Sequence, residues 1–346
     1  MALKLIEGFD HFSTVAKMAA KGWSLVGGAT GTGSLPAGRI EGNCYQVVST
    51  AGQNSQLVKS LPAAYGTVVI GFAFKFSALP TSTNDILLLR TVGGVSVGSV
   101  RLVTGTGQLR IVNGSGSTIA TGATALSVGT WYFIELKIFV NGASGTGELM
   151  LNGVSEIAST TGNFGSTNIG QVLIQSGSSA ATQQWDDMYL LDTSGSAPNN
   201  TFLGDVHVET LFPSADGAHT DFTPNSGSNH FDRVNDQAGT FPDDDTTYVS
   251  DATVGHRDSY AYDDLSVLTG TIFGVQTVQD ARKDDAGTRQ IAAVARVSGT
   301  DYDGATVTLG TTYAMGTEIR ETNPNTSAAW TVSDVNGAEF GIKVVA

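Results

Sequence analysis

Two acidic stretches in the second half of the sequence have residue types that suit a divalent cation. The candidates in "PDDDTT" and "GTDYDGA" are Asp243, Asp244, Asp245, Asp301 and Asp303. Carboxylate oxygens are the hard ligands that Ca²⁺ prefers, and the second stretch begins like an EF-hand loop, although Thr312 stands where the closing Glu should be. Acidic turns are also common without a metal. The five aspartates are therefore candidate calcium ligands, and no other cofactor is expected.

Paired carboxyl groups could instead perform acid–base chemistry. Cleavage of a glycosidic bond needs two carboxyl groups that flank the same bond. Asp186 and Asp187 are adjacent in the sequence, so on a strand their side chains would point to opposite faces. Glu135 and Lys137 are expected to face outward and to pair weakly across water. We predict that Glu135, Glu148, Asp186 and Asp187 are not catalytic.

Other kinds of reactive site have little support in the sequence. The five histidines are scattered and form no HxH or HExxH motif, which argues against a zinc site. The glycine-rich stretch 28–38 lacks the Lys-Ser/Thr pair of a phosphate-binding loop. No local motif supplies a Ser/His/Asp set, which leaves open a set assembled from distant positions. Cys44, the single cysteine, is expected to be a small buried side chain. We therefore expect no enzyme activity.

Most of these residues lie in stretches with the period of a β-strand. Phe72, Phe74 and Phe76 alternate with small residues and Lys75. Residues 129–154 predict two antiparallel strands joined by a glycine-rich turn, with every second residue from 132 to 140 on the inner face. Trp131 and Trp185 lie in such strands and are expected in the core, although Trp23, Trp131, Trp185 and Trp330 are the candidates for an aromatic ligand platform.

The remaining elements are few. Residues 13–22 predict one short helix that Ser13 or Thr14 caps and that Gly22 ends. A polar linker is expected at 193–200, after which residues 202–212 alternate again. An acidic, ordered excursion follows at 213–264. A β meander comes next, in which residues 271–283 turn at 284–287 into 288–297, and a short turn or helix is expected at 331–336.

The composition is that of a β protein with many turns. The chain has 346 residues, of which 40% are hydrophobic and only 14% charged, and it contains 43 glycines without a collagen period. No stretch is long enough to span a membrane. The N-terminus lacks the long apolar region of a signal peptide, so we expect synthesis in a reducing cytoplasm.

The charge is divided unequally along the chain. Residues 1–196 contain ten basic and ten acidic residues, whereas residues 197–346 contain eight basic and 22 acidic residues, so the whole net charge of −14 lies in the second part. A nucleic-acid partner is not expected, because a phosphate backbone would be repelled. The change in composition predicts two domains, 1–196 and an acidic β-rich domain at 197–346.

Three fragments in a fixed order resemble the concanavalin A-like, or laminin-G-like, jelly-roll superfamily. These fragments are Phe72–Phe76, the hairpin from Gly129 to Gly153, and "WDDMY" at 185–189. The resemblance covers about residues 1–195. It implies an all-β protein, in which a jelly-roll sandwich is followed by a second β-rich, sandwich-like domain. The superfamily also includes glycoside hydrolases whose carboxylates follow Glu-x-Asp-x-x-Glu, and none of the nine glutamates begins that pattern.

A second resemblance covers more of the chain. The start "IEGFDHFST", the passage at 185–213, "DDDTTYVSDATVGHRDSY" and the ending at 323–345 are similar to a family of tailed-bacteriophage virion proteins. Members of that family are tail-fibre-like or minor structural proteins. The resemblance implies a component of a phage particle that is assembled in the host bacterial cytoplasm.

These observations leave three functions to compare. The first is a structural and adhesive virion protein of the tail, fibre or capsid, which acts through contacts with identical subunits and other virion proteins, and with a trimer as the favoured assembly. The alternative is a carbohydrate-binding lectin module that contacts a host-surface glycan. The third is a glycan-degrading enzyme. None of the three requires nucleic-acid binding or membrane insertion.

Overall fold

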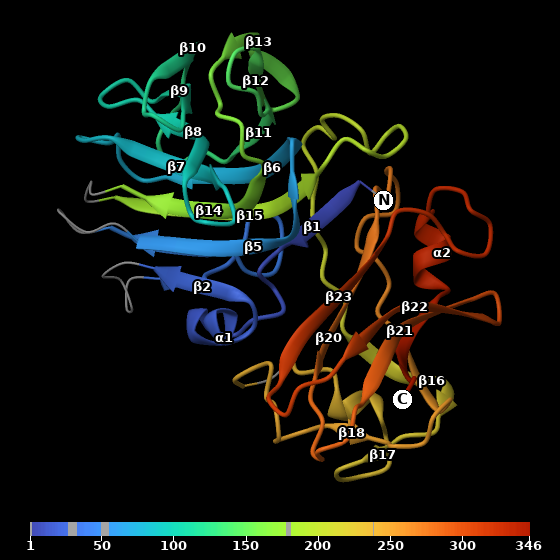
Figure 1. The fold of residues 1–346 in the computed structure, drawn as a ribbon. Coiled ribbons are helices and arrows are strands. Elements are labelled where there is room, and N and C mark those ends of the chain that lie inside the picture. The colour runs from blue at the N-terminus through green and yellow to red at the C-terminus, as the bar shows by residue number, and fades with distance from the viewer. Residues whose placement is uncertain (1, 27–32, 50–54, 178–180, 238) are drawn as a thin grey trace. The chain divides into compact units, whose positions relative to one another are not determined.

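The structure, a computed structural model, describes all residues except 1, 27–32, 50–54, 178–180 and 238 (Figure 1). It consists almost entirely of antiparallel strands, as the sequence predicts. Two compact units are present: one contains residues 1–10 and 18–208, and the other contains residues 11–17 and 209–346. Residues 197–208 thus belong to the first unit. The division of the chain into two domains at 196/197 stays a prediction. The described residues form no helix that is both long and apolar enough to cross a membrane.

The first unit contains two large antiparallel sheets. The eight-stranded sheet has the order β13 (Val154–Gly162), β12 (Gly145–Leu151), β11 (Tyr132–Phe139), β6 (Thr67–Phe76), β15 (Thr182–Leu191), β4 (Tyr45–Val48) and β3 (Gly33–Ser34), with β1 (Leu3–Glu7) also paired to β15. The seven-stranded sheet has the order β10 (Thr118–Ala125), β9 (Gln108–Asn113), β8 (Ser96–Leu102), β7 (Asn84–Arg90), β14 (Ile169–Ser176), β5 (Ser55–Tyr65) and β2 (Trp23–Val26). This arrangement confirms the predicted concanavalin A-like sandwich.

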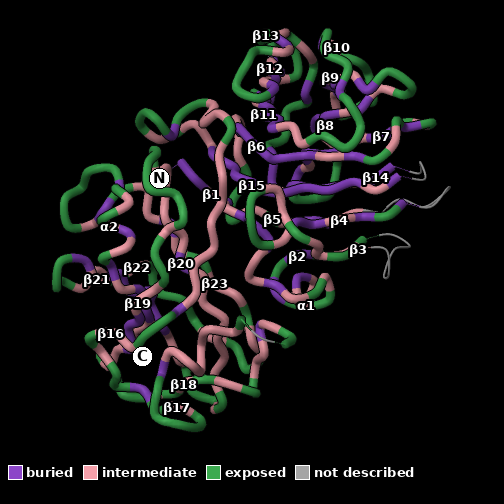
Figure 2. Tube along the Cα trace, turned by 180° about the vertical axis from the view of Figure 1, so that it is seen from behind, coloured by how far each residue is buried: buried purple, intermediate pink, exposed green. Residues whose placement is uncertain are grey.

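The core of the first unit lies between these sheets. Phe72, Phe74 and Phe76 are at most 1% exposed, and the ring of Phe74 lies 5.4 Å from that of Trp185. The indole Nε1 of Trp185 donates to the Ile86 carbonyl of the opposite sheet at 3.1 Å. Trp185 is therefore a core residue, as predicted, and Figure 2 shows the central strands around it in the colour of buried residues.

The second unit is built on a five-stranded antiparallel sheet. Its order is β16 (Pro213–Thr220), β19 (Arg257–Tyr262), β24 (Glu339–Val344), β21 (Gln290–Val297) and β22 (Thr300–Thr308). Two further pairs are β17 (Thr223–Pro224) with β18 (Val249–Ser250), and β20 (Val275–Ala281) with β23 (Ala314–Arg320). The meander predicted from 271 to 297 is wrong in its pairing, because β20 pairs with β23, and β21 pairs with β22 and β24.

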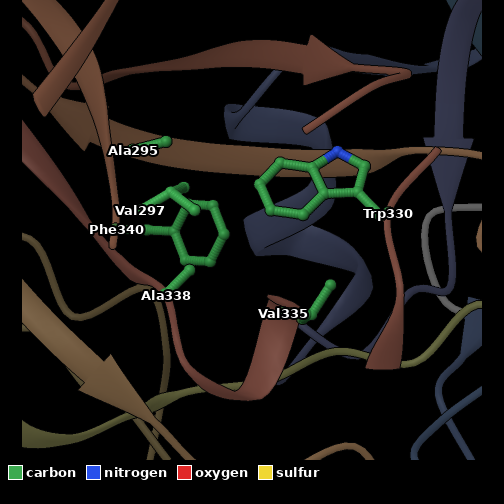
Figure 3. Packing of buried hydrophobic residues seen from close by; sticks show 6 residues of the cluster. All are labelled: Ala295, Val297, Trp330, Val335, Ala338 and Phe340. Carbon is green, nitrogen blue, oxygen red and sulfur yellow. The ribbon is translucent and has the colours of Figure 1, made fainter. Parts of the chain in front are cut away.

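One apolar cluster stabilises the second unit. It consists of Ala295, Val297, Trp330, Val335, Ala338 and Phe340 (Figure 3). The rings of Trp330 and Phe340 are 6.2 Å apart, and the Trp330 indole also donates to the Arg320 carbonyl at 3.0 Å. Burial of these side chains holds the short helix α2 (Val332–Asn336) against the sheet.

The helices are short, as predicted. Helix α1 (Val15–Ala20) begins after Thr14, whose hydroxyl accepts from the Lys17 amide at 3.2 Å. Helix α2 has a capping box, in which Thr331 and Asp334 each accept a hydrogen bond from the other residue's backbone N–H. The remaining helix is the single turn η1 (Phe231–Arg233). Residues 28–32 of the glycine-rich stretch considered as a phosphate loop lie outside the described residues.

Candidate functional site

The outer face of the eight-stranded sheet, meaning the side that faces away from the core of the first unit, carries most of the polar side chains of interest. Residues that are directly opposite on neighbouring strands share a face. On β6 the phenylalanines point to the core, so Gly71, Ala73 and Lys75 lie on the outer face. Gly71 is opposite Glu135 and Tyr189, and Ala73 is opposite Asp186. Two different zones follow along this face.

The first zone, called here the acid zone, consists of Glu135, Asp186, Asp187 and Tyr189. Glu135 is fully buried, and its Oε1 accepts hydrogen bonds from the Tyr189 hydroxyl at 2.5 Å and the Gly204 amide at 2.9 Å. Burial raises the pKa of Glu135 above its usual value. The predicted pairing of Glu135 with Lys137 across water is therefore wrong, because another part of the chain covers this position.

Gly71 is needed for this arrangement. The Tyr189 ring lies over Gly71, and a Cβ at that position would be only 2.1 Å from Tyr189 Cε1. The same ring stacks on Phe133 at a centroid distance of 6.4 Å. A side chain at residue 71 would thus displace Tyr189 from both Phe133 and Glu135.

The two adjacent aspartates do not obey the strand rule used to interpret them. The pairing of β15 with β6 is irregular between Asp186 and Tyr189, and Asp187 has a φ of 50°. Both carboxylates consequently reach Arg39: its backbone N–H donates to Asp186 at 2.7 Å, and its Nε lies 2.8 Å from Asp187 Oδ2. The predicted opposite orientation is wrong for this reason. Burial and the neighbouring Asp187 raise the pKa of Asp186 to about 8.

A segment of the same unit, the strap Leu203–Val208, covers the acid zone. The backbone N–H groups of Leu203, Gly204 and Val208 donate to Tyr189, Glu135 and Asp187, at 3.1, 2.9 and 2.8 Å. The strap lies within the segment 202–212, whose alternating sequence suggested another strand, but these residues form none. Their backbone groups bind side chains of the sheet instead of a neighbouring strand.

Charged groups also hold the strap. The Arg39 guanidinium donates to Asp205 at 2.5 Å and to the Val206 carbonyl at 2.7 Å, and it lies 5.5 Å from the centre of the Phe133 ring. His207 Nδ1 is 3.0 Å from Asp187 Oδ1, and its Nε2 is 3.1 Å from Glu41. The hydrogen bond to Asp187 is the main reason why the pKa of His207 rises to about 9. The strap therefore closes the acid zone, and its His207 carries a positive charge at neutral pH.

The second zone, called here the polar row, lies one step further along the strands, and its burial varies: Ser34 is exposed, three members are partly buried, and Gln184 is 9% exposed. Its members are Ser34, Gln46, Gln184, Lys75 and Trp131. Ser34 is opposite Gln46, and Gln184 is opposite both Gln46 and Lys75. Trp131 directly precedes Tyr132, which is opposite Phe74, so the next position along β6 places Trp131 beside Lys75. The row thus crosses β3, β4, β15 and β6 and ends at the start of β11.

The polar row presents both hydrogen-bond acceptors and a cation. Gln46 Nε2 donates to Ser34 Oγ at 3.1 Å, and Gln184 Nε2 donates to Cys44 Sγ at 3.4 Å. Among the residues that the structure describes, no donor binds the Oε1 atom of either amide. Lys75 Nζ lies 4.6 Å from the centre of the Trp131 ring, and no carboxylate in the described part of the chain pairs with it.

Trp131 itself differs from the sequence-based expectation. Its side chain is only partly buried, whereas Trp23, Trp185 and Trp330 are at most 2% exposed. The sequence places Trp131 within a strand and hence in the core, but β11 begins only at Tyr132, so Trp131 lies just before the strand. Cys44 next to the row is buried as predicted, and burial raises the pKa of its thiol to about 12.

The calcium candidates lie in the second unit, and protein groups already bind their carboxylates. Asp243 accepts hydrogen bonds from the backbone N–H and the hydroxyl of Thr247. Asp244 forms an ion pair with Lys17 at 2.7 Å, and Asp245 forms one with Arg282 at 2.8 Å. Asp301 pairs with His219 and Arg296 at 2.8 Å each, and Asp303 pairs with Arg257 and Lys343. Among the described residues, none of the five belongs to a cluster of three or more metal-ligating side chains. Calcium binding at these residues stays a prediction.

Comparisons with known proteins give likenesses of fold only. No protein-family model matches the sequence, and no curated protein matches it. Among solved structures, the catalytic domain of a glycoside hydrolase family 131 protein from Coprinopsis cinerea is 13% identical with a TM-score of 0.42, over 59% of this chain and 99% of that chain. Lectin II from Ulex europaeus is 13% identical with a TM-score of 0.38, over 54% of this chain and 97% of that chain. A cellulose-induced protein, Cip1, is 15% identical with a TM-score of 0.41, over 50% of this chain and 91% of that chain. At such low identities and TM-scores, these likenesses assign no function to this chain.

Proposed function

We propose that the first unit is a carbohydrate-binding, lectin-like module without catalytic activity. The polar row carries this proposal, because it aligns two amides, a hydroxyl, an ammonium group and an indole across one sheet face, beside the zone that the strap covers. Sugars present many hydroxyl groups, and a few placed polar groups beside an aromatic surface are what orient such a ligand. Since strands are spaced ~4.8 Å apart, the row is roughly 19 Å long, which suits an extended chain.

The closed acid zone favours binding over catalysis. Acid–base catalysis requires a carboxyl group within hydrogen-bond reach of the substrate. Glu135, Asp186 and Asp187 are 3% exposed or less, and the strap and Arg39 bind one or more oxygens of each, while Glu135 Oε2 is buried without a hydrogen-bond partner among the described residues. A sugar on the outer face would therefore meet the polar row and not the acids.

The test is binding of the full chain to immobilised glycans, followed by calorimetry with the best ligand. Gln184→Ala and Gln46→Ala should each weaken binding about tenfold, because each removes an acceptor from the row. Gln171→Ala is the matched control, since Gln171 lies on the other sheet, with its side chain bound to the Val92 carbonyl. Equal affinity of all three variants, or no glycan bound at all, would reject the proposal.

A second proposal concerns the setting in which this module works. The resemblance of the sequence to phage structural proteins favours a structural role in a phage particle. The carbohydrate-binding face would then contact a host surface, and identical subunits would assemble, with a trimer as the favoured state. Mass spectrometry of purified particles and light scattering of the chain test this: absence from particles excludes the virion role, and a monomer excludes the trimer.

A further inference from the structure

We propose that the ligand of the polar row is an anionic polysaccharide, whose negatively charged sugar substituent pairs with Lys75. This inference rests on the proposed function and names the class of glycan. The shared chemistry is an anionic group on a sugar ring, which a carboxylate, a sulfate or a phosphate can supply.

The first argument is the state of the lysine. Two basic side chains described around the outer face have an acidic partner: Arg39 binds Asp187 and Asp205, and Lys4 binds Asp192 at 3.2 Å. Among the described residues, Lys75 has no acidic partner. Its Nζ lies over the Trp131 ring, which holds the ammonium group in place. The ring accepts no conventional hydrogen bond, so the three N–H donors of the ammonium group are left for other acceptors. A positioned ammonium group with spare donors is a site for an anion.

The second argument is the charge around it. Apart from Lys75, the other members of the row are uncharged, and residues 1–196 have equal numbers of acidic and basic residues. Asp186 of the acid zone is opposite Ala73, two positions along β6 from Lys75. There Asp187 is neutralised by Arg39 and His207, and the raised pKa of Asp186, about 8, keeps that group protonated at neutral pH. An anionic ligand in the row would therefore meet Lys75 as the single charged member of the row, although the whole chain is acidic.

The third argument is the division of roles along the row. The unused Oε1 atoms of Gln46 and Gln184 accept hydrogen bonds, which sugar hydroxyl groups donate. Lys75 donates only, so it needs an acceptor, and an anionic oxygen forms the stronger, charge-assisted bond. Acceptors beside one cation match a ligand that has both hydroxyl groups and a negative charge.

The experiment uses calorimetry on the full chain with oligogalacturonate, a sulfated oligosaccharide and a neutral oligomer of glucose of equal length. Lys75→Gln should weaken binding of an anionic oligosaccharide about tenfold, and Lys75→Arg should retain most of it. The matched control is Lys137→Gln, which removes a lysine from the outer face of β11, outside the row. Raising the salt concentration should weaken binding to the wild-type chain more than to Lys75→Gln.

The outcomes separate the two proposals. Equal effects of Lys75→Gln and Lys137→Gln, or a neutral oligomer that binds as tightly as the charged ones, would overturn the anionic ligand. If Gln184→Ala still weakened that binding about tenfold, the carbohydrate-binding function would stand. No binding to any of the three oligosaccharides would reject both. The charged oligosaccharide with the higher affinity identifies the anionic group.

Discussion

The acid zone and the polar row lie on the same face of one sheet, yet the chain treats them in opposite ways. In the acid zone, the strap fills the space above the sheet, and its backbone N–H groups satisfy Tyr189, Glu135 and Asp187. In the polar row, the side chains bind their neighbours and leave acceptors and an ammonium group for a ligand. Buried carboxyl groups here contribute to architecture, whereas the weakly charged row is the part suited to recognition. Substitutions in the two zones should therefore separate stability from binding.

Arg39→Leu should have the largest effect on stability. It leaves the 1% exposed Asp187 with His207 as its remaining charged partner, and it releases Asp205 and the Val206 carbonyl. Loss of one partner of a buried ion pair costs about 3–5 kcal/mol. Urea denaturation should show this loss, and hydrogen exchange should rise at residues 203–208. Unchanged exchange in these residues would mean that the strap is held without Arg39.

Gly71→Ala should have the next largest effect. The added Cβ would overlap the Tyr189 ring, and overpacking of this kind costs about 1–3 kcal/mol. Gly93→Ala is the control, because the nearest atom to a Cβ at that exposed turn is Thr91 Oγ1 at 3.8 Å. Equal denaturation midpoints for the two variants would show that Tyr189 moves at no cost.

The sequence predicts which residues of these zones lie in buried strands, but it does not predict what covers the zones. Alternation correctly predicts the buried strands, because Phe72, Phe74 and Phe76 need one apolar face whatever their partners are. It also assigns Glu135 to the opposite face. It does not show that the strap covers that face, since the bonds from Gly204 join residues 69 positions apart.

The errors have the same origin. The rule that adjacent residues point to opposite faces fails at Asp186 and Asp187 because of the irregular pairing and the positive φ of Asp187. Alternation places Lys75 on the side of its strand opposite the phenylalanines, but only the register between β6 and β15 places it beside Gln184. Pairing between strands distant in sequence is set by packing of the whole unit and has no local signal.

The pH dependence of stability should distinguish the acid zone from the rest of the first unit. Asp186 and His207 have pKa values of about 8 and about 9 in the folded chain, both above their ordinary values. Each contributes stability that is complete below its ordinary pKa and is lost as the pH rises through the folded value. The contribution of Asp186 to the free energy of unfolding should therefore fall from its ordinary pKa of 3.8 up to about 8, and that of His207 from 6.5 up to about 9. Urea midpoints across this range measure it, and Asp186→Asn should flatten the lower part of the fall. A midpoint that rises with pH would contradict the assignment.

The smallest effect on stability should come from the polar row. Gln46 is partly exposed, and the bond from its Nε2 reaches the exposed Ser34 at 3.1 Å, so water replaces this bond readily in Gln46→Ala. Surface substitutions of this kind change the free energy of unfolding by no more than about 0.5 kcal/mol. The same variant should nevertheless bind its glycan about tenfold more weakly, because an acceptor is missing from the row. Denaturation and calorimetry on one preparation give both values. A loss of stability comparable with that of Arg39→Leu would show that the row, like the acid zone, serves the architecture of the sheet, and the contrast between the zones would then no longer support a binding site.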